Sequence, residues 1–457
     1  MFMKWSKYNL YFDIDEYYLG IFNSLYKSLS LYKKPNMVNF KRKIPFDIKE
    51  FSKDLIYKMQ QKGFVLEKDI NEEGLVKRKY YLKNNQDFIP GICIYLTYDC
   101  NFDCVYCYEK NQNGKNNYNY NDKKFKISNL IEFVKRNIEE NKPYSIMFFG
   151  GEPLLEKEKL LNITEKINDE VKKKNSKLLV SITTNGFLLD KKFINKIKKF
   201  KIRNIQITID GNKKRHNARR PLKSGEGSFS QIVKNLKYAV GVLSKKSISV
   251  RVNVDDSNKS SVGILYKKLE ELDIIDKIIF TYGRVWVSSN NRKKLKDRLG
   301  NEIIEIEGKE YRNIVSKLPS ELSLKSNHMS NSHLNKAIMN KLAYRPCIVR
   351  NNNFYVVDLN GDIYKCFIDA GNEKKKIGKV SKGINEKNKT FLKFVSYEPW
   401  KYKPCNNCEI LPMCYGGCPN GRIFEDKNLK GKCSGTKITV RNKIKEIIND
   451  EYKKITK

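Results

Sequence analysis

The chain lacks any apolar run that would cross a membrane. None of its 457 residues belongs to a stretch that approaches the roughly 18 to 20 apolar residues a membrane helix requires. The first residues, MFMKWSKYNLYFDIDE, also lack the apolar core and small-residue cleavage site of a secretory signal peptide. The sequence therefore predicts a cytoplasmic protein without membrane contact.

Acidic residues are scarce relative to basic ones. Asp and Glu number 51 against 90 Lys and Arg, which gives a formal net charge of +39. Clustered basic residues would indicate binding to nucleic-acid phosphates, but these lysines are spread along the whole chain. We therefore predict a solvated lysine surface that makes nucleic acid an unlikely partner and favours an acidic peptide.

The sequence shows no internal repeat, and its length exceeds what one hydrophobic core supports. Residues 1–88 are predicted to form a small αβ module. Its expected elements are two strands within residues 8–32, an amphipathic helix that Gly63 ends, and one further strand. The polar stretch 67–86 is predicted to be a linker.

From residue 91 onward, apolar β-branched strands alternate with helical stretches, which predicts a parallel sheet in an α/β fold, as in a partial (β/α)6 TIM-like barrel. The expected strands are 91–98, 144–151, 177–186, 202–211, 247–256 and 277–285. The predicted domains are 1–88, a barrel over 89–283, an insertion with a hairpin and a helix over 284–345, a cysteine-rich domain over 346–435, and a helix over 436–457.

No cysteine lies between Cys107 and Cys347, so the eleven cysteines fall into two groups. Thiols in the cytosol stay reduced, which favours metal binding or catalysis over disulfides. Cys100, Cys104 and Cys107 follow the first barrel strand with the spacing C-x3-C-x2-C. Three thiolates make a poor zinc site but suit a four-iron cluster with one open iron, and purely structural cysteines or zinc are the alternatives.

This loop resembles that of the radical S-adenosylmethionine (radical SAM) enzymes, whose hallmark is C-x3-C-x-aromatic-C, with Tyr106 in the aromatic place. The resemblance implies that the open iron binds S-adenosylmethionine. It also implies that an electron from the cluster splits this cofactor into methionine and a 5′-deoxyadenosyl radical, which takes a hydrogen atom from the substrate.

The ends of the next three predicted strands, FFGGEP, TTNG and ITIDG, also resemble motifs of this family. Taken singly, such residues are also common as helix caps or rim salt bridges. His216 lies between the third motif and its arginine, as in related subfamilies. The resemblance implies cofactor contacts from Gly150, Gly151, Glu152, Thr184, Asn185, Thr208, Asp210 and Arg220.

The second cysteine group contains the run C-x2-C-x5-C-x3-C from Cys405 to Cys418, with Cys347 and Cys366 before it and Cys433 after it. This pattern resembles the SPASM domain of radical SAM enzymes that mature peptides and proteins. The resemblance implies two auxiliary 4Fe-4S clusters, and therefore three clusters in the chain, with one auxiliary iron open because only seven cysteines are present. Two zinc ions are the alternative, since Cys405 and Cys408 form a zinc-like pair. Cys93, inside the first strand, is predicted to be a small buried hydrophobe. The family pattern assigns Cys347, Cys366 and Cys418 to the nearer cluster and Cys405, Cys408, Cys414 and Cys433 to the farther one.

The N-terminal module resembles the winged-helix domain that captures the leader of a precursor peptide by adding a strand to a sheet edge. Sulfatase maturases carry an aspartate, taken to be the base, directly after the second SPASM cysteine, where this chain has Phe367, with Asp369 two residues later. We therefore expect thioether crosslinking of a Cys-rich precursor peptide, with flavodoxin or ferredoxin as electron donor and no general base assigned. The alternatives are a formylglycine-generating maturase, an RNA-modifying radical SAM enzyme and a non-catalytic metal protein that binds a peptide.

Overall fold

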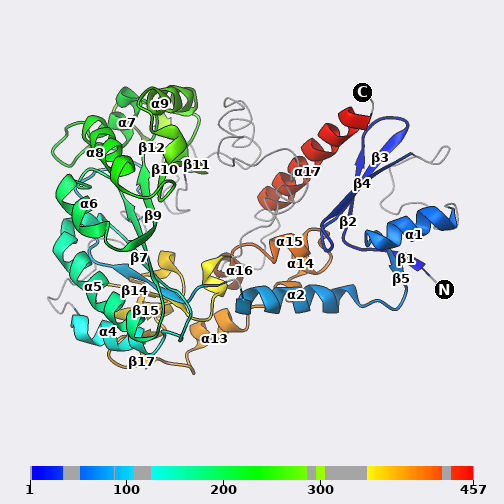
Figure 1. The fold of residues 1–457 in the computed structure, drawn as a ribbon, viewed down its shortest axis with the longest axis horizontal. Coiled ribbons are helices and arrows are strands. Elements are labelled where there is room, and N and C mark those ends of the chain that lie inside the picture. Colours follow the sequence, from blue (N-terminus) through cyan, green and yellow to red (C-terminus); the bar gives the residue numbers. More distant parts are fainter. Residues whose placement is uncertain are drawn as a thin grey trace. The chain divides into compact units, whose positions relative to one another are not determined.

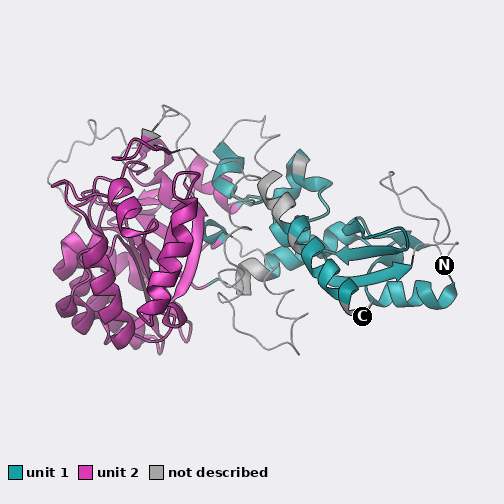
Figure 2. Ribbon diagram, turned by 90° about the horizontal axis from the view of Figure 1, so that it is seen from above, with its two compact units in different colours: residues 1–88, 329–350, 396–457 teal, residues 89–328, 351–395 magenta. Residues whose placement is uncertain are grey.

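The computed structural model describes residues 3–33, 52–86, 88–107, 109, 125–285, 295–303, 347–424 and 434–455. The chain divides into two compact units (Figure 2). Unit 1 comprises residues 1–88, 329–350 and 396–457, and unit 2 comprises residues 89–328 and 351–395. Within the described residues, no helix has the length and apolarity that a membrane crossing needs.

All six strands expected for the barrel are present in unit 2, and they pair in parallel in the order of the chain. The prediction of an α/β fold with a parallel sheet is therefore confirmed. Because the strands run in one direction, their carboxyl ends meet at the same edge of the sheet. The strands are β6 (Gly91–Tyr95), β7 (Tyr144–Phe149), β8 (Leu178–Thr184), β9 (Lys201–Thr208), β10 (Ile248–Val254) and β11 (Ile279–Arg284).

Helices connect these strands and cover one face of the sheet (Figure 1). Their apolar sides and the strands form one large core that includes Ile94, Phe148 and Ile182. Side chains cap the first turns of two of these helices. Asp190 accepts from the N–H of Phe193 at 2.8 Å at the start of the helix Lys191–Ile197, and Asn212 accepts from the N–H of Arg215 at the start of the helix Lys213–Arg219. The helices are α4 (Ile127–Lys135), α5 (Lys157–Lys173), α6 (Lys191–Ile197), α7 (Lys213–Arg219), α8 (Phe229–Val242) and α9 (Lys259–Glu271), with the 3-10 turns η2 (Pro153–Glu156) and η3 (Ile275–Lys277).

The same sheet continues beyond β6 with four strands from much later in the chain. β14 (Phe354–Val357) pairs in parallel with β6, and β15 (Asp362–Tyr364) then follows antiparallel. Because this pairing joins residues 351–395 to unit 2, the predicted domain 346–435 contributes to both units. The remaining elements here are β16 (Gly378–Lys379), β17 (Gly383–Ile384), η7 (Phe367–Asp369), η8 (Glu373–Lys375) and α13 (Lys389–Val395).

Within the predicted insertion, the expected hairpin is present as β12 (Leu295–Lys296) and β13 (Glu302–Ile303), which pair antiparallel. The helix expected in the same insertion falls on residues outside those that the structure describes.

The first strands of unit 1 correct the sequence prediction. Residues 8–32 contain three antiparallel strands instead of two: β2 (Asn9–Asp13), β3 (Tyr18–Asn23) and β4 (Ser28–Lys33). In the turn between β2 and β3, the side chain of Asp15 accepts from the N–H groups of Tyr17 and Tyr18. In the turn between β3 and β4, the side chain of Asn23 accepts from the N–H groups of Leu25 and Tyr26.

The expected amphipathic helix is α1 (Lys53–Gln61), and Gly63 follows it with φ +71°. After it, β5 (Val65–Glu67) pairs with β1 (Met3–Trp5).

The predicted linker was wrong, because most of it is the helix α2 (Glu72–Gln86). Two apolar positions one turn apart, Val76 and Tyr80, are buried in a core with Trp400, and Glu72 accepts hydrogen bonds from Ser6 and from the N–H of Lys7. The stretch is polar because only one narrow side of this helix is buried.

The last part of unit 1 consists of short turns and one long helix, which confirms the expected terminal helix. The long helix packs on the N-terminal sheet, since a Cβ built on Gly20 of β3 would lie 2.9 Å from the side chain of Ile448. The elements are η6 (Ile348–Arg350), η9 (Pro399–Lys401), α14 (Lys403–Asn406), α15 (Leu411–Cys414), α16 (Pro419–Phe424) and α17 (Ser434–Ile455).

Asn23 offers a test of the three-stranded arrangement. Its buried amide donates to Ser6, Asn9 and the carbonyl of Gly63, and it accepts from two N–H groups of the turn. Replacing Asn23 with Ala should lower the free energy of unfolding of unit 1 by about 3 kcal/mol, because several buried groups lose their partner. Hydrogen exchange of the β2–β4 amides in urea measures this, and exposed Asn195→Ala in unit 2 should leave it unchanged.

Candidate active site

The first cysteine loop lies where β6 ends, beside the segment that follows α7. The N–H of Asp103 donates to the carbonyl of Pro221 at 2.8 Å, and the N–H of Val105 donates to that of Arg219 at 3.2 Å. Cys104 is buried, whereas Cys100 and Cys107 are half-buried. The loop is therefore fixed by its backbone along one side.

The three thiols are close enough to affect one another. Burial raises the pKa of Cys104 to about 12, and the other two thiols add to that rise. Burial also raises the pKa of Cys100. The thiols of Cys100 and Cys104 are consequently protonated in the metal-free protein and must lose their protons to bind a metal.

Two glycines follow β7, and the second of them meets this loop. Gly150 and Gly151 have φ values of +86° and +50°, and a Cβ on Gly151 would lie 2.2 Å from the carbonyl oxygen of Asp99. The N–H of Glu152 donates to that same oxygen at 2.8 Å. Glycine is required here because any side chain would push the cysteine loop away.

The carboxylate of Glu152 is fully buried and joins β7 to β8. It accepts from Thr184 Oγ1 at 2.7 Å and from the N–H groups of Asn185 and Leu154 at 2.7 and 3.0 Å. Burial raises the pKa of Glu152, and these three donors oppose the rise. A carboxylate has about four acceptor positions, so one is left for the predicted contact with an ammonium group.

Asn185 reaches the cysteine loop directly from the end of β8. Its Nδ2 donates to Asn101 Oδ1 at 2.7 Å and lies 3.8 Å from the sulfur of Cys100. Thr184 is occupied by Glu152, and Thr208 is buried at the end of β9. The structure thus places Asn185 next to the thiol of Cys100 and Thr184 next to Glu152.

Tyr106, between the second and third cysteines, is at the centre of a largely buried hydrogen-bond network. Its hydroxyl donates to the carboxylate of Asp210 and accepts from Arg220 Nη1 at 2.9 Å and Asn253 Nδ2 at 3.2 Å. The N–H of Asn253 in turn donates to Asp210 at 2.9 Å. This network joins the cysteine loop to the ends of β9 and β10.

Arg219 completes the network, and sequence analysis missed it. It is fully buried, pairs with Asp255 at 2.7 Å and Asp210 at 3.5 Å, and places its guanidinium over the ring of Tyr106. Asn253, Asp255 and Arg219 were not predicted because they belong to no recognised motif. The signal that could have revealed them was the adjacent pair Arg219 and Arg220, because an arginine that is buried needs carboxylates beside it.

Arg220 fits an anionic group at the thiols. It is buried, and its Nε has no hydrogen-bond partner among the described residues. Burial lowers the pKa of Arg220, but Cys104, Tyr106 and Asp210 outweigh that effect and raise the pKa well above its usual value. A buried guanidinium with a free donor suits a cluster held by thiolates or the carboxylate of S-adenosylmethionine.

His216 holds Arg220 in place. Its Nδ1 accepts from the N–H of Asp210 at 3.1 Å, so its Nε2 carries the proton and donates to Ser228 at 3.0 Å. Ser228 then donates to the carbonyl of Arg220 at 2.9 Å. Burial and the nearby Arg220 lower the pKa of His216 to about 3, so the ring is neutral at pH 7.

The second cysteine group is divided between the units. Cys347 belongs to unit 1, and Cys366 follows β15 in unit 2. Burial raises the pKa of Cys347, and the nearby Cys418 adds to the rise. Cys405, Cys408 and Cys414 lie on α14, α15 and the turn between them, and Cys433 falls outside the described residues. Cys93 is fully buried in β6, which confirms that prediction. Among the described cysteines none forms a disulfide, and no described group of three metal-binding side chains is spaced for a single metal ion.

Position 367 follows Cys366 and carries no base. The ring of Phe367 packs on Phe149 at the end of β7, with centroids 5.6 Å apart, and Tyr95 donates to its backbone carbonyl at 2.8 Å. Asp369 is buried in an ion pair with Lys375 at 2.8 Å.

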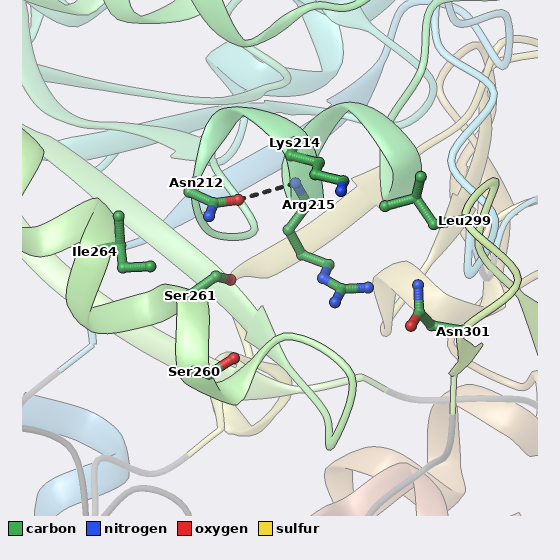
Figure 3. Close-up of a pocket in the computed structure, with 8 residues that line it drawn as sticks. All are labelled: Asn212, Lys214, Arg215, Ser260, Ser261, Ile264, Leu299 and Asn301. Atoms are coloured by element: carbon green, nitrogen blue, oxygen red, sulfur yellow. Dashed lines mark hydrogen bonds between the residues drawn. The ribbon is translucent and has the colours of Figure 1, made fainter.

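A pocket of about 390 Å³ lies between α7, α9 and the β12–β13 hairpin (Figure 3). Arg215 points into it and pairs with Asp297 at 3.1 Å. None of the site residues predicted from the sequence lines this pocket, so it is separate from the cysteine loop. Its lining is Asn212, Lys214, Arg215, Ser260, Ser261, Ile264, Leu299 and Asn301.

Residues 94–269, which span the cysteine loop and the strand ends described above, match the family model of the Radical SAM superfamily. The chain is an enzyme that contains a radical SAM domain. This domain implies a 4Fe-4S cluster and S-adenosylmethionine.

Two relatives and one solved structure are similar to this chain over most of its length. The radical SAM cyclopropyl synthase TigE of Paramaledivibacter caminithermalis is 24% identical over 96% of this chain and 93% of that protein. The cysteine-type anaerobic sulfatase-maturating enzyme of Clostridium perfringens is 25% identical over 70% of this chain and 85% of that one. The structure of anSMEcpe with bound AdoMet and the Cp18Cys peptide has a TM-score of 0.56 and 20% identity over 79% of this chain and 99% of that one, which shows a shared fold.

Gly151 tests how closely β7 must approach the cysteine loop. Gly151→Ala should lower the rate of 5′-deoxyadenosine formation by about a hundredfold, since a shift of about 1 Å in reacting groups has such effects. Gly263→Ala is the matched control, because nothing lies within 4 Å of a Cβ built there. Equal rates in the two variants, measured with S-adenosylmethionine and dithionite, would contradict this role.

The pKa of His216 predicts a pH dependence of stability. The unfolded chain gains a proton on this histidine below about pH 6.5, but the folded protein does so only near pH 3. Its contribution is therefore complete above pH 6.5 and is lost as the pH falls toward 3, with about 2 kcal/mol lost between pH 7 and pH 5. Urea denaturation of the metal-free protein should show this loss, and His216→Asn should reduce it by that amount.

Proposed function

We propose that this radical SAM enzyme matures a precursor peptide by joining a cysteine sulfur to a carbon atom in a thioether link. The observation that carries the proposal is the convergence of three thiols, the two glycines of β7, Asn185 and the buried Arg220 at one edge of the sheet. When bound there, S-adenosylmethionine and a reduced cluster would supply the 5′-deoxyadenosyl radical that removes hydrogen from the peptide.

The residues of the chain have separate parts in this proposal. Cys100, Cys104 and Cys107 would hold the cluster, and Glu152 would use its remaining acceptor position for the amino group of the cofactor. The unpaired Nε of Arg220 would bind the carboxylate of the cofactor. Tyr106 and His216 position these groups and exclude water, because both are buried.

Position 367 supports thioether formation because its side chain cannot act as a base. Formation of formylglycine calls for a base to take a proton from the substrate, but Phe367 packs on Phe149 and Asp369 is neutralised by Lys375. A thioether link removes one hydrogen from the carbon and one from the thiol. One hydrogen goes to 5′-deoxyadenosine, and the other leaves as a proton while its electron passes to an acceptor, for which the second cysteine group would hold auxiliary iron-sulfur clusters.

A second candidate is closure of a cyclopropyl ring between carbon atoms of the peptide. It is favoured by the similarity to the cyclopropyl synthase TigE, which extends over nearly the whole of both chains. The similarity to the sulfatase-maturating enzyme likewise makes the formylglycine reaction a named alternative, although it covers less of the chain.

The N-terminal module is the part we assign to leader recognition. β4 is at the edge of its sheet and pairs only with β3 among the described residues. An extended leader peptide would add to this edge by backbone hydrogen bonds.

The test is to incubate the anaerobically reconstituted protein with S-adenosylmethionine, dithionite and Cys-rich precursor peptides, and to analyse the products by mass spectrometry after thiol alkylation. We expect each link to remove two hydrogens and one alkylatable thiol, and Cys104→Ala to abolish both changes. Loss of two hydrogens with all thiols still alkylated would instead support ring closure. Loss of sulfur with gain of a hydrazide-reactive aldehyde would support formylglycine, and unchanged peptides despite 5′-deoxyadenosine formation would contradict peptide maturation.

A further inference from the structure

The cysteines assigned to the farther auxiliary cluster are buried against the N-terminal module. Cys405 belongs to a core with Tyr8 and Leu25 of that module and with Tyr80 of α2. Cys414 belongs to a second core, which includes Leu10, Phe12 and Phe22 from β2 and β3. Cys408 packs against both cores. Residues of the N-terminal module therefore line one side of this cysteine site.

Polar contacts hold the same parts of unit 1 together. Ser24, just after β3, donates to the carbonyl of Glu409, the residue that follows Cys408. The carboxylate of Glu409 pairs with Lys437 at 2.8 Å and Arg441 at 2.9 Å, both on α17. The position of Cys408 relative to the N-terminal module is thus fixed on both sides.

On this side of the cysteine site, the hydroxyl of Tyr8 has no hydrogen-bond partner among the described residues. The side chain is 1% exposed, and its oxygen makes no hydrogen bond within the described part of the chain. A buried tyrosine hydroxyl normally finds a partner because leaving a donor unpaired is costly.

We propose that the Tyr8 hydroxyl donates a hydrogen bond to a sulfur atom of the iron-sulfur cluster that Cys405, Cys408 and Cys414 would help to hold. The inference rests on the proposed function, which assigns a cluster to these cysteines. Thiolate and sulfide sulfurs are acceptors with negative charge, whereas the other side chains of this core are aliphatic or aromatic. Such a bond stabilises the more negative, reduced cluster and therefore raises its reduction potential.

The proposal gives the N-terminal module a role beyond capturing a leader. One of its side chains sets the potential at which the farther cluster accepts or gives an electron.

The experiment uses the full-length chain with Cys100, Cys104 and Cys107 replaced by Ala, so that only the auxiliary clusters remain. In this background, Tyr8→Phe removes a single oxygen atom. Tyr32→Phe is the matched control, because Tyr32 belongs to the same module and packs in a core that contains no cysteine. Iron content and a redox titration followed by electron paramagnetic resonance are measured for all three proteins.

We expect Tyr8→Phe to make one auxiliary midpoint potential more negative, while Tyr32→Phe leaves both unchanged. Electron-nuclear double resonance should also show a cluster-coupled proton that exchanges in D₂O and is absent in Tyr8→Phe. Full iron content with an unchanged potential would overturn the role of Tyr8 alone, as would the lack of such a proton in the parent protein. Absence of iron from the parent protein would overturn the auxiliary clusters and this inference together, although cofactor cleavage by the native chain would still support the radical SAM chemistry.

Discussion

The site depends on the buried bond between the hydroxyl of Tyr106 and the carboxylate of Asp210. It connects a short loop, which leaves the sheet after β6, to a strand three positions away. Because Arg220 and Asn253 also bond to this hydroxyl, the loop and the ends of β9 and β10 cannot move independently. Tyr106, Asp210 and Arg220 are buried and Asn253 is half-buried, so these hydrogen bonds compete little with water and stay directional.

The rest of the site follows from this connection. Glu152 ties β7 to β8, and the glycines before it let the backbone of β7 contact the cysteine loop. The thiols thereby lie beside the carboxylate of Glu152 after β7, the amide of Asn185 after β8 and the guanidinium of Arg220 after α7. Parallel strands make this possible because all of their carboxyl ends lie at one edge.

Unit 1 shows how the second cysteine group relates to the beginning of the chain. The N-terminal strands, α2 and α17 share their hydrophobic cores with Cys405, Cys408 and Cys414. Capture of a leader peptide and electron transfer are therefore proposed for one compact unit.

Much of this was predictable. Cys100, Cys104, Cys107 and the strand-end motifs are local patterns, and the alternation of apolar strands with helices determined a parallel sheet. The third N-terminal strand and α2 were missed because side-chain bonds from Asp15 and Asn23 and a narrow buried stripe, rather than strong periodicity, define them. Arg219, Asn253 and the unpaired hydroxyl of Tyr8 were decided by tertiary structure alone. Spacing along a chain specifies which residues can share a loop, whereas a buried charge or donor acquires its partners only when distant strands have packed around it.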